Sequence, residues 1–353
     1  MCTSRVSSIL ARPTPGGIGD NERMTDAVRQ RYARFARDET PGRSIRYTEW
    51  AQGVAADAEM CAVLARLDEQ HRQPPLVFAV ARMLGAPVAG YDRWRSFVLE
   101  HADAVVAECA QRSVQTNEPL RLSALLPALG AVDGPIALLE IGAAAGLCLY
   151  PDRYSYRLVG PDGELRRALD PRGGPSPVVL TSRVCGPLPP LRMPEVVWRA
   201  GIDLAPLDAR DPDDAAWLSA LVWPGETERA ARISAALRIA ADDPPLLRAG
   251  EAADLLHDTA ALAPADATLV VTTPGVLVYL PRPRRLALID GIRALDARWV
   301  TIDAPGLHDG WRPPLDPDDG EGFAVALDGR VIARADPLGR WWEWHPDETP
   351  RRS

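Results

Sequence analysis

The chain has 353 residues, a net charge of -8 and 46% hydrophobic residues, enough for one large folded domain or two. Lysine is absent and all 40 basic residues are arginine, which excludes a lysine Schiff base and the lysine of a phosphate-binding P-loop. The acidic balance and the lack of a basic run disfavour a nucleic-acid partner. No apolar run approaches the ~20 residues that span a bilayer, so no membrane association is expected.

The five cysteines are widely spaced, without a C-x-x-C pair or a histidine at zinc-finger spacing. This usage is typical of reduced thiols in the cytoplasm, which is the predicted location. Asp303 follows a predicted strand, but a single acid makes no metal site, and no metal is expected. Residues 1–24 lack the apolar core of roughly 7–15 residues that defines a signal peptide, and we predict a disordered leader there.

Residues 25–132 show a helical pattern without strand signals and predict an all-helical N-terminal subdomain. Val28, Tyr32 and Phe35 recur at spacings of four and three, as on one buried helix face. Apolar residues stay on one face throughout residues 92–112, which predicts a single long helix.

Residues 133–353 change to short apolar strands that alternate with helical segments. This alternation predicts an α/β fold with a doubly wound, mostly parallel sheet, here of seven strands. Asp328-Gly329, between two alternating runs, predicts a C-terminal antiparallel hairpin. Residues 150–194 form an insertion rich in proline and glycine, with a hairpin around Pro161-Asp162-Gly163 and irregular loop after it.

The stretch LLEIGAAAGLCL, residues 138–149, places small residues directly after the first predicted strand. The dinucleotide pattern G-x-G-x-x-G starting at Gly142 fails at Ala144 and at Leu147. The pattern acid-x-G-x-G-x-G is matched by Glu140, Gly142 and Gly146, and only Ala144 departs from it. The alternative is a strand that runs into a tightly packed helix start.

Two further segments carry polar residues that a ligand could use. Asp203 ends the next predicted parallel strand, where a carboxylate can accept hydrogen bonds from both ribose hydroxyls; alternatively, it caps a turn. Asn117, Glu118 and Arg121 join two helices just before the first strand and are candidates for the substrate side of a pocket. The alternative is that Asn117 is a helix N-cap, with a proline in the first turn.

The chain from about residue 135 onward resembles the class I methyltransferases that use S-adenosylmethionine. The likeness rests on the glycine turn, on GIDL at 201–204, on TLVVTTPGVLVYLP at 268–281 and on the terminal hairpin. It implies a cofactor site made of Glu140, Gly142, Ala144, Gly146, Asp203 and Glu251, with Glu251 near the adenine. It also places Tyr279 beside the substrate, unless this tyrosine lies in the core.

Most of the chain is also similar to a bacterial family, the domain of unknown function 2332, which has no established activity to carry over. That likeness rests on RSVQTNEPLRLSALLPAL, LLEIGAAAGLCLYPDRYSY, RAGIDLAPLD and ALVWP.

Three hypotheses on function remain open at this point. The first is an S-adenosylmethionine-dependent methyltransferase that acts on an unidentified small-molecule acceptor. The second is a catalytically inactive scaffold of the same fold, or a ligand-binding protein. The third, a nicotinamide-dependent oxidoreductase, is disfavoured because the dinucleotide pattern fails.

Overall fold

The computed structural model describes residues 18–316 and 322–345, which form two compact units. Unit 1 consists of the described residues up to Val114 together with Ala220–Glu226, and unit 2 of residues 115–219 and of those from Thr227 onward. The predicted leader lies outside the described residues as far as residue 17. From Ile18 the chain is helical, so the prediction of disorder up to residue 24 is wrong for its last seven residues.

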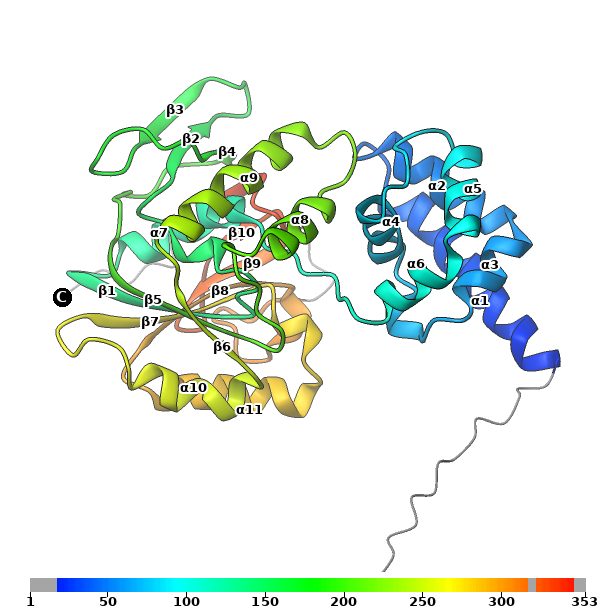
Figure 1. Ribbon diagram of the computed structural model, residues 1–353. Coiled ribbons are helices and arrows are strands. Elements are labelled where there is room, and N and C mark those ends of the chain that lie inside the picture. The colour runs from blue at the N-terminus through cyan, green and yellow to red at the C-terminus, as the bar shows by residue number, and fades with distance from the viewer. Residues whose placement is uncertain (1–17, 317–321, 346–353) are drawn as a thin grey trace, which may run out of the picture. The chain divides into compact units, whose positions relative to one another are not determined.

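Residues 18–114 of unit 1, coloured blue to cyan in Figure 1, form helices without strands and pack around aromatic side chains. Val28, Tyr32 and Phe35 are buried on one face of the first helix, as predicted. Ser44 and Asp57 cap the second and third helices by accepting hydrogen bonds from backbone amides in the first turn. The helices are α1 (Ile18–Asp38), α2 (Ile45–Ala56), α3 (Ala58–Leu64), η1 (Glu69–His71), α4 (Pro74–Met83), α5 (Tyr91–Glu100) and α6 (Ala102–Cys109).

The single helix predicted over residues 92–112 is instead two helices, α5 and α6, which meet at His101. The His101 ring stacks on Phe97 with 4.2 Å between the ring centroids, and its Nδ1 lies 2.9 Å from the Phe97 carbonyl oxygen. The break is not visible in the sequence because Val105 and Cys109 are again buried in the second helix.

Unit 2 contains one sheet of eleven described strands, not the seven predicted. Its order is β3-β2-β4-β11-β10-β9-β8-β7-β1-β5-β6. The strands are β1 (Pro135–Ile141), β2 (Ser155–Val159), β3 (Leu165–Leu169), β4 (Val179–Cys185), β5 (Glu195–Asp203), β6 (Leu246–Ala249), β7 (Thr268–Pro274), β8 (Arg298–Asp303), β9 (Phe323–Leu327), β10 (Arg330–Ala335) and β11 (Trp341–Trp344). The mixed α/β prediction with a mostly parallel sheet is confirmed.

The parallel core of this sheet is doubly wound. From β1 the chain proceeds to β5 and β6 on one side and then to β7 and β8 on the other, with all these pairings parallel. Helices α10 (Ala252–Ala260) and α11 (Arg282–Ala294) lie side by side on one face, and α7 (Leu122–Gly130) and α9 (Thr227–Asp242) lie on the opposite face (Figure 1). The switch point, where such folds bind ligands, is therefore at the carboxyl ends of β1 and β7.

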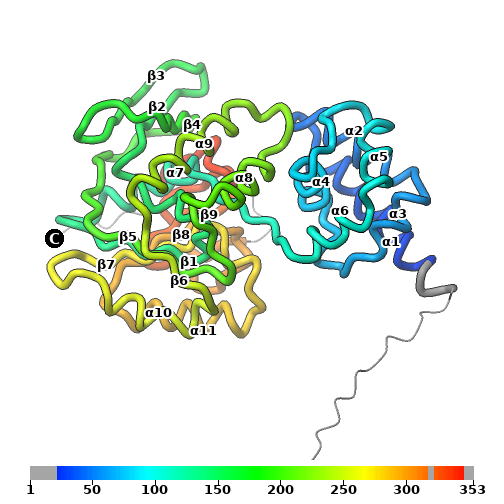
Figure 2. The backbone as a smooth tube through the Cα atoms, viewed as in Figure 1, coloured from blue at the N-terminus to red at the C-terminus, as the bar shows by residue number. Residues whose placement is uncertain are grey.

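The insertion at 150–194 is part of the sheet. The predicted hairpin is present as β2 and β3, but the segment predicted as irregular loop contains β4, which pairs in parallel with β2 and with β11. Leu180, Ser182 and Val184 of β4 are buried in alternation, while Val179 is 42% exposed, so the period of two does not appear as an apolar/polar alternation in the sequence. These strands form the edge that projects at the top of Figure 2.

The predicted C-terminal hairpin is present as β9 and β10, with Asp328 and Gly329 both left-handed at the turn. It continues into a third strand, β11. None of the described helices is long and apolar enough to cross a membrane.

Candidate functional site

The turn after β1 has left-handed backbone at three alternate residues: Gly142, Ala144 and Gly146, with φ of 75°, 48° and 73°. Left-handed backbone therefore recurs at every second residue of the turn, including the position where alanine stands in place of glycine. A left-handed alanine is strained by about 1 kcal/mol. The Ala144 amide donates to Asp203 Oδ2 at 2.8 Å, and its carbonyl accepts from the Leu207 amide at 3.1 Å; both bonds hold it in place.

The two glycines of the turn are also required by close packing. A Cβ atom on Gly142 would lie 2.5 Å from Val276 Cγ2, and one on Gly146 would lie 2.9 Å from Pro245 Cγ. The turn leads into η3 (Leu147–Leu149), a 3-10 helix of three residues. The predicted alternative, a strand that runs into a tightly packed helix start, therefore stays open, with a buried 3-10 helix as the helical element.

Asp203 lies at the carboxyl end of β5, next to the glycine turn. Its Oδ2 accepts from Ala144 and its Oδ1 accepts from the Ala205 amide at 3.0 Å. Asp203 therefore does cap a turn. Each carboxylate oxygen keeps one further lone pair and the residue is half-buried, so it can still accept hydrogen bonds from a ligand.

Asn117 bonds to the glycine turn and is not a helix N-cap. Its Nδ2 donates to the Ala143 carbonyl at 3.1 Å, and its Oδ1 accepts from the Leu147 amide at 2.9 Å. The N-cap of η2 (Pro119–Arg121) is Glu118, whose Oε1 accepts from the Leu120 amide at 3.0 Å. The alternative prediction, that Asn117 is the N-cap, is therefore wrong, because the N-cap is the next residue, Glu118.

Glu118 is completely buried and paired with two arginines of α9. Arg229 Nε donates to Oε2 at 2.7 Å and Arg232 Nε donates to Oε1 at 2.9 Å. These bonds join the segment before β1 to the helix that covers the sheet.

Arg121 lies at the end of β7 and donates to backbone carbonyls, at 2.7 Å to Pro274 and at 2.8 Å to Pro337. Burial raises the pKa of two carboxyl groups, Glu140 and Asp303, and the positive charge of Arg121 partly offsets this rise. The guanidinium therefore lies between the ends of β1 and β8.

Glu140 and Asp303 are the buried acids of the switch point. Burial raises the pKa of Glu140 well above its ordinary value, and Glu140 Oε2 has no hydrogen-bond partner among the described residues. Burial likewise raises the pKa of Asp303 to about 7, although Thr301 Oγ1 donates to its Oδ2 at 2.8 Å. In the sequence Asp303 is only a lone acid after a predicted strand; in the structure it ends β8, the strand beside β7.

Glu251 and Tyr279 lie apart from these contacts. Glu251 precedes α10, with its Oε2 3.8 Å from Arg284 Nη1 of α11. Tyr279, in η4 (Leu277–Tyr279), is 69% exposed, so the alternative that placed it in the core is wrong.

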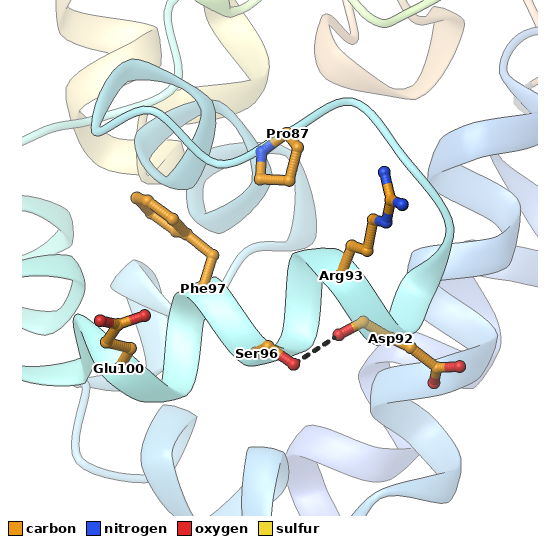
Figure 3. A pocket seen from close by; sticks show the side chains of 6 residues that line it. All are labelled: Pro87, Asp92, Arg93, Ser96, Phe97 and Glu100. Carbon is orange, nitrogen blue, oxygen red and sulfur yellow. Dashed lines mark hydrogen bonds between the residues drawn. The ribbon is translucent and has the colours of Figure 1, made fainter.

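Two surface hollows are described, and neither is lined by the glycine turn. Figure 3 shows one of about 430 Å³ on α5, with Pro87 and Phe97 as its apolar wall. The other, of about 300 Å³, lies in unit 2 between α8 (Pro212–Ala220) and α9.

Asp203 and the left-handed turn adjoin at the carboxyl ends of β5 and β1. Asp203 offers carboxylate oxygens at the end of β5, and the left-handed turn presents backbone groups at the end of β1. Ala143–Leu147 are buried in the described structure, and Asn117 occupies two of their polar groups. A ligand on the turn therefore requires that Asn117 move or share these bonds.

Taken together, the chain is an α/β protein with a doubly wound parallel core and a left-handed small-residue turn at its switch point. Residues 85–344 match the family model described as "Uncharacterized protein conserved in bacteria (DUF2332)", and the chain belongs to this family. A comparison with curated proteins gives no match.

Proposed function

We propose that the protein is an S-adenosylmethionine-dependent methyltransferase that acts on a small-molecule acceptor. The observation that carries this proposal is the run of left-handed residues at 142, 144 and 146, directly bonded to the carboxylate of Asp203 on the neighbouring strand. A nucleoside needs both features: backbone that it can approach closely and an acid for its ribose hydroxyls.

In this proposal Asp203 accepts the ribose hydroxyls, and the turn from Gly142 to Gly146 contacts the rest of the cofactor through its backbone. Glu140, buried beneath the turn, supports it, and Glu251 lies beyond the neighbouring strand β6, toward the adenine. When bound, S-adenosylmethionine supplies the electrophilic methyl group. Because methyl transfer depends mainly on position and in-line geometry, no catalytic triad is required.

The short η3 helix favours this cofactor over a nicotinamide dinucleotide. A dinucleotide places its pyrophosphate at the N-terminus of an α-helix, where free amides and the helix dipole stabilise the negative charge. Three residues of 3-10 helix provide little of either. S-adenosylmethionine carries no phosphate and has no such requirement.

A second candidate function is that of a methyltransferase-like scaffold without catalytic activity. The burial of Ala143–Leu147 and the two bonds from Asn117 favour it, because they close the turn.

The test is calorimetric titration of the purified chain with S-adenosylhomocysteine, with NADH as the control ligand. We expect micromolar binding of the first ligand alone, weakened at least tenfold, or about 1.4 kcal/mol, by Asp203→Asn. The matched control is Asp208→Asn, on the same loop but paired with Arg210, which should not change the affinity.

If neither ligand binds, the methyltransferase proposal is wrong, and the inactive scaffold with a closed turn is favoured. Binding without methyl transfer to any of a broad set of small-molecule acceptors would support the inactive scaffold.

A further inference from the structure

The segment Ala220–Glu226, ALVWPGE, belongs to unit 1, although the residues before and after it belong to unit 2. It connects α8 to α9 and contains no helix or strand beyond the last residue of α8. Its peptide groups are therefore held mainly by side chains of unit 1 and not by a backbone ladder. We call this segment the clasp.

The centre of the clasp is Trp223, whose side chain is enclosed by aromatic and cationic groups. Its ring centroid lies 5.3 Å from that of Phe35 and 5.4 Å from that of Tyr47. The Arg43 guanidinium carbon lies 3.6 Å from the centroid of the tryptophan ring. Trp223 is 7% exposed, so unit 1 has a pocket shaped for a large aromatic side chain.

Polar side chains of unit 1 donate hydrogen bonds to the backbone of the clasp. Arg82 Nη1 donates to the carbonyls of Ala220 at 3.0 Å and of Val222 at 2.7 Å. Ser44 Oγ donates to the carbonyl of Pro224 at 2.7 Å. Three of the seven carbonyl groups are thus bound by side-chain donors.

The acidic end of the clasp is bound by charge. Arg43 donates to Glu226 Oε1 through Nη2 at 3.1 Å and through Nε at 3.2 Å. Both side chains are mostly buried, at 24% and 15% exposure, so the pair is screened less than a surface ion pair.

We propose that unit 1 is a peptide-recognition module for a Trp-Pro-Gly-acid sequence, and that the clasp is its ligand, bound within the same chain. The clasp contains a turn, closed by the bond from the Glu226 amide to the Trp223 carbonyl at 3.1 Å. An aromatic pocket, donors for alternate carbonyls and a cation for an acidic side chain are contacts by which a protein can bind such a peptide. Pro224 restricts the free peptide and so lowers the entropy lost on binding. A partner protein with this sequence in an exposed segment would compete for the same surface.

The test uses a peptide with the sequence of residues 219–228 and the full chain carrying Trp223→Ala, which vacates the aromatic pocket. In the wild type the clasp competes at an effective concentration of roughly millimolar. We therefore expect the variant to bind the labelled peptide at least tenfold more tightly than the wild type, by fluorescence anisotropy. A peptide with alanine in place of tryptophan should not bind, and Leu204→Ala, a large-to-small change at a residue 68% exposed in unit 2, should behave as the wild type.

A folded Trp223→Ala chain that does not bind the peptide at millimolar concentration would overturn the proposal. If this variant does not fold, the titration is made with Glu226→Gln, which retains the tryptophan but removes the negative charge that Arg43 binds. The variant and the wild type could also form a dimer in which the second copy supplies the clasp. If the peptide dissociates such a dimer, the result supports the proposal. A dimer that the peptide leaves intact, without peptide binding, would contradict it.

Discussion

Ala144 is the residue at which the sequence departs from the glycine pattern, and the structure gives it the conformation that glycine would have. Its neighbours Ala143 and Ala145 are also buried, but neither has a positive φ. The three alanines therefore differ in backbone strain while sharing their environment.

We expect Ala144→Gly to cost less stability than Ala143→Gly or Ala145→Gly, by about 1 kcal/mol. All three substitutions remove a buried methyl group and increase the freedom of the unfolded chain, but only the first also relieves left-handed strain. Urea unfolding of the three variants measures the difference. Equal losses at all three positions would show that the turn is not strained at residue 144.

Asp303 makes the stability of the protein depend on pH. Its pKa is about 7 in the folded chain and about 3.9 when unfolded, so between these values the folded state binds the proton more tightly. The free energy of unfolding therefore falls as pH rises through this window and levels off above pH 7.

We expect Asp303→Asn, which cannot ionise, to remove this loss. The variant should gain stability relative to the wild type as pH rises from about 4 to about 7, measured by thermal unfolding at successive pH values. Asp309→Asn, at a carboxylate 72% exposed, is the control and should show no such trend. A constant difference between Asp303→Asn and the wild type would mean that Asp303 does not titrate in this window.

At the scale of elements, the short η2 helix is fixed by α9 through Glu118. Its two partners, Arg229 and Arg232, lie on one face of the first turns of α9 and are themselves largely buried, at 14% and 12% exposure. Asn117, one residue before Glu118, bonds to the glycine turn. Two consecutive side chains, Asn117 and Glu118, therefore connect the candidate site to α9.

We expect Glu118→Gln to destabilise the protein by about 3–5 kcal/mol, because it removes the buried negative charge that both arginines bind. The same substitution type at an exposed pair, Asp103→Asn opposite Arg66, should cost about 0–1 kcal/mol; Asp103 is 92% exposed there. Chemical denaturation compares the two. A small effect of Glu118→Gln would show that water or another group neutralises the arginines.

At the scale of the whole molecule, the clasp makes unit 1 depend on residues more than a hundred positions further along the chain. We expect Trp223→Ala to cost about 3–5 kcal/mol and to speed amide hydrogen exchange in α2 and α4, which carry Tyr47 and Arg82. Exchange in β1 should stay unchanged, as it should throughout the molecule in Leu204→Ala. Faster exchange in β1 and α2 alike would show that the clasp stabilises both units equally.

Much of the molecule could be predicted from local pattern. The helix face of Val28, Tyr32 and Phe35, the buried strand before the glycine turn and the Asp328-Gly329 hairpin all follow from periodicity or from the backbone preference of a few neighbouring residues. The break at His101 could not be predicted in this way, because both helices keep the same apolar face.

The sequence by itself determined the α/β class, the small-residue turn after β1 and the acids near the ends of β1 and β5, because these depend on residues close together in the chain. Only the tertiary structure decided how the polar residues at 117–121 are used. Glu118 meets Arg229 across 111 positions and Arg121 meets Pro337 across 216. The same holds for the pairing of β4 with β11 and for the capture of Trp223 by unit 1. Such partners are brought together by the packing of the whole fold, and no local preference specifies them.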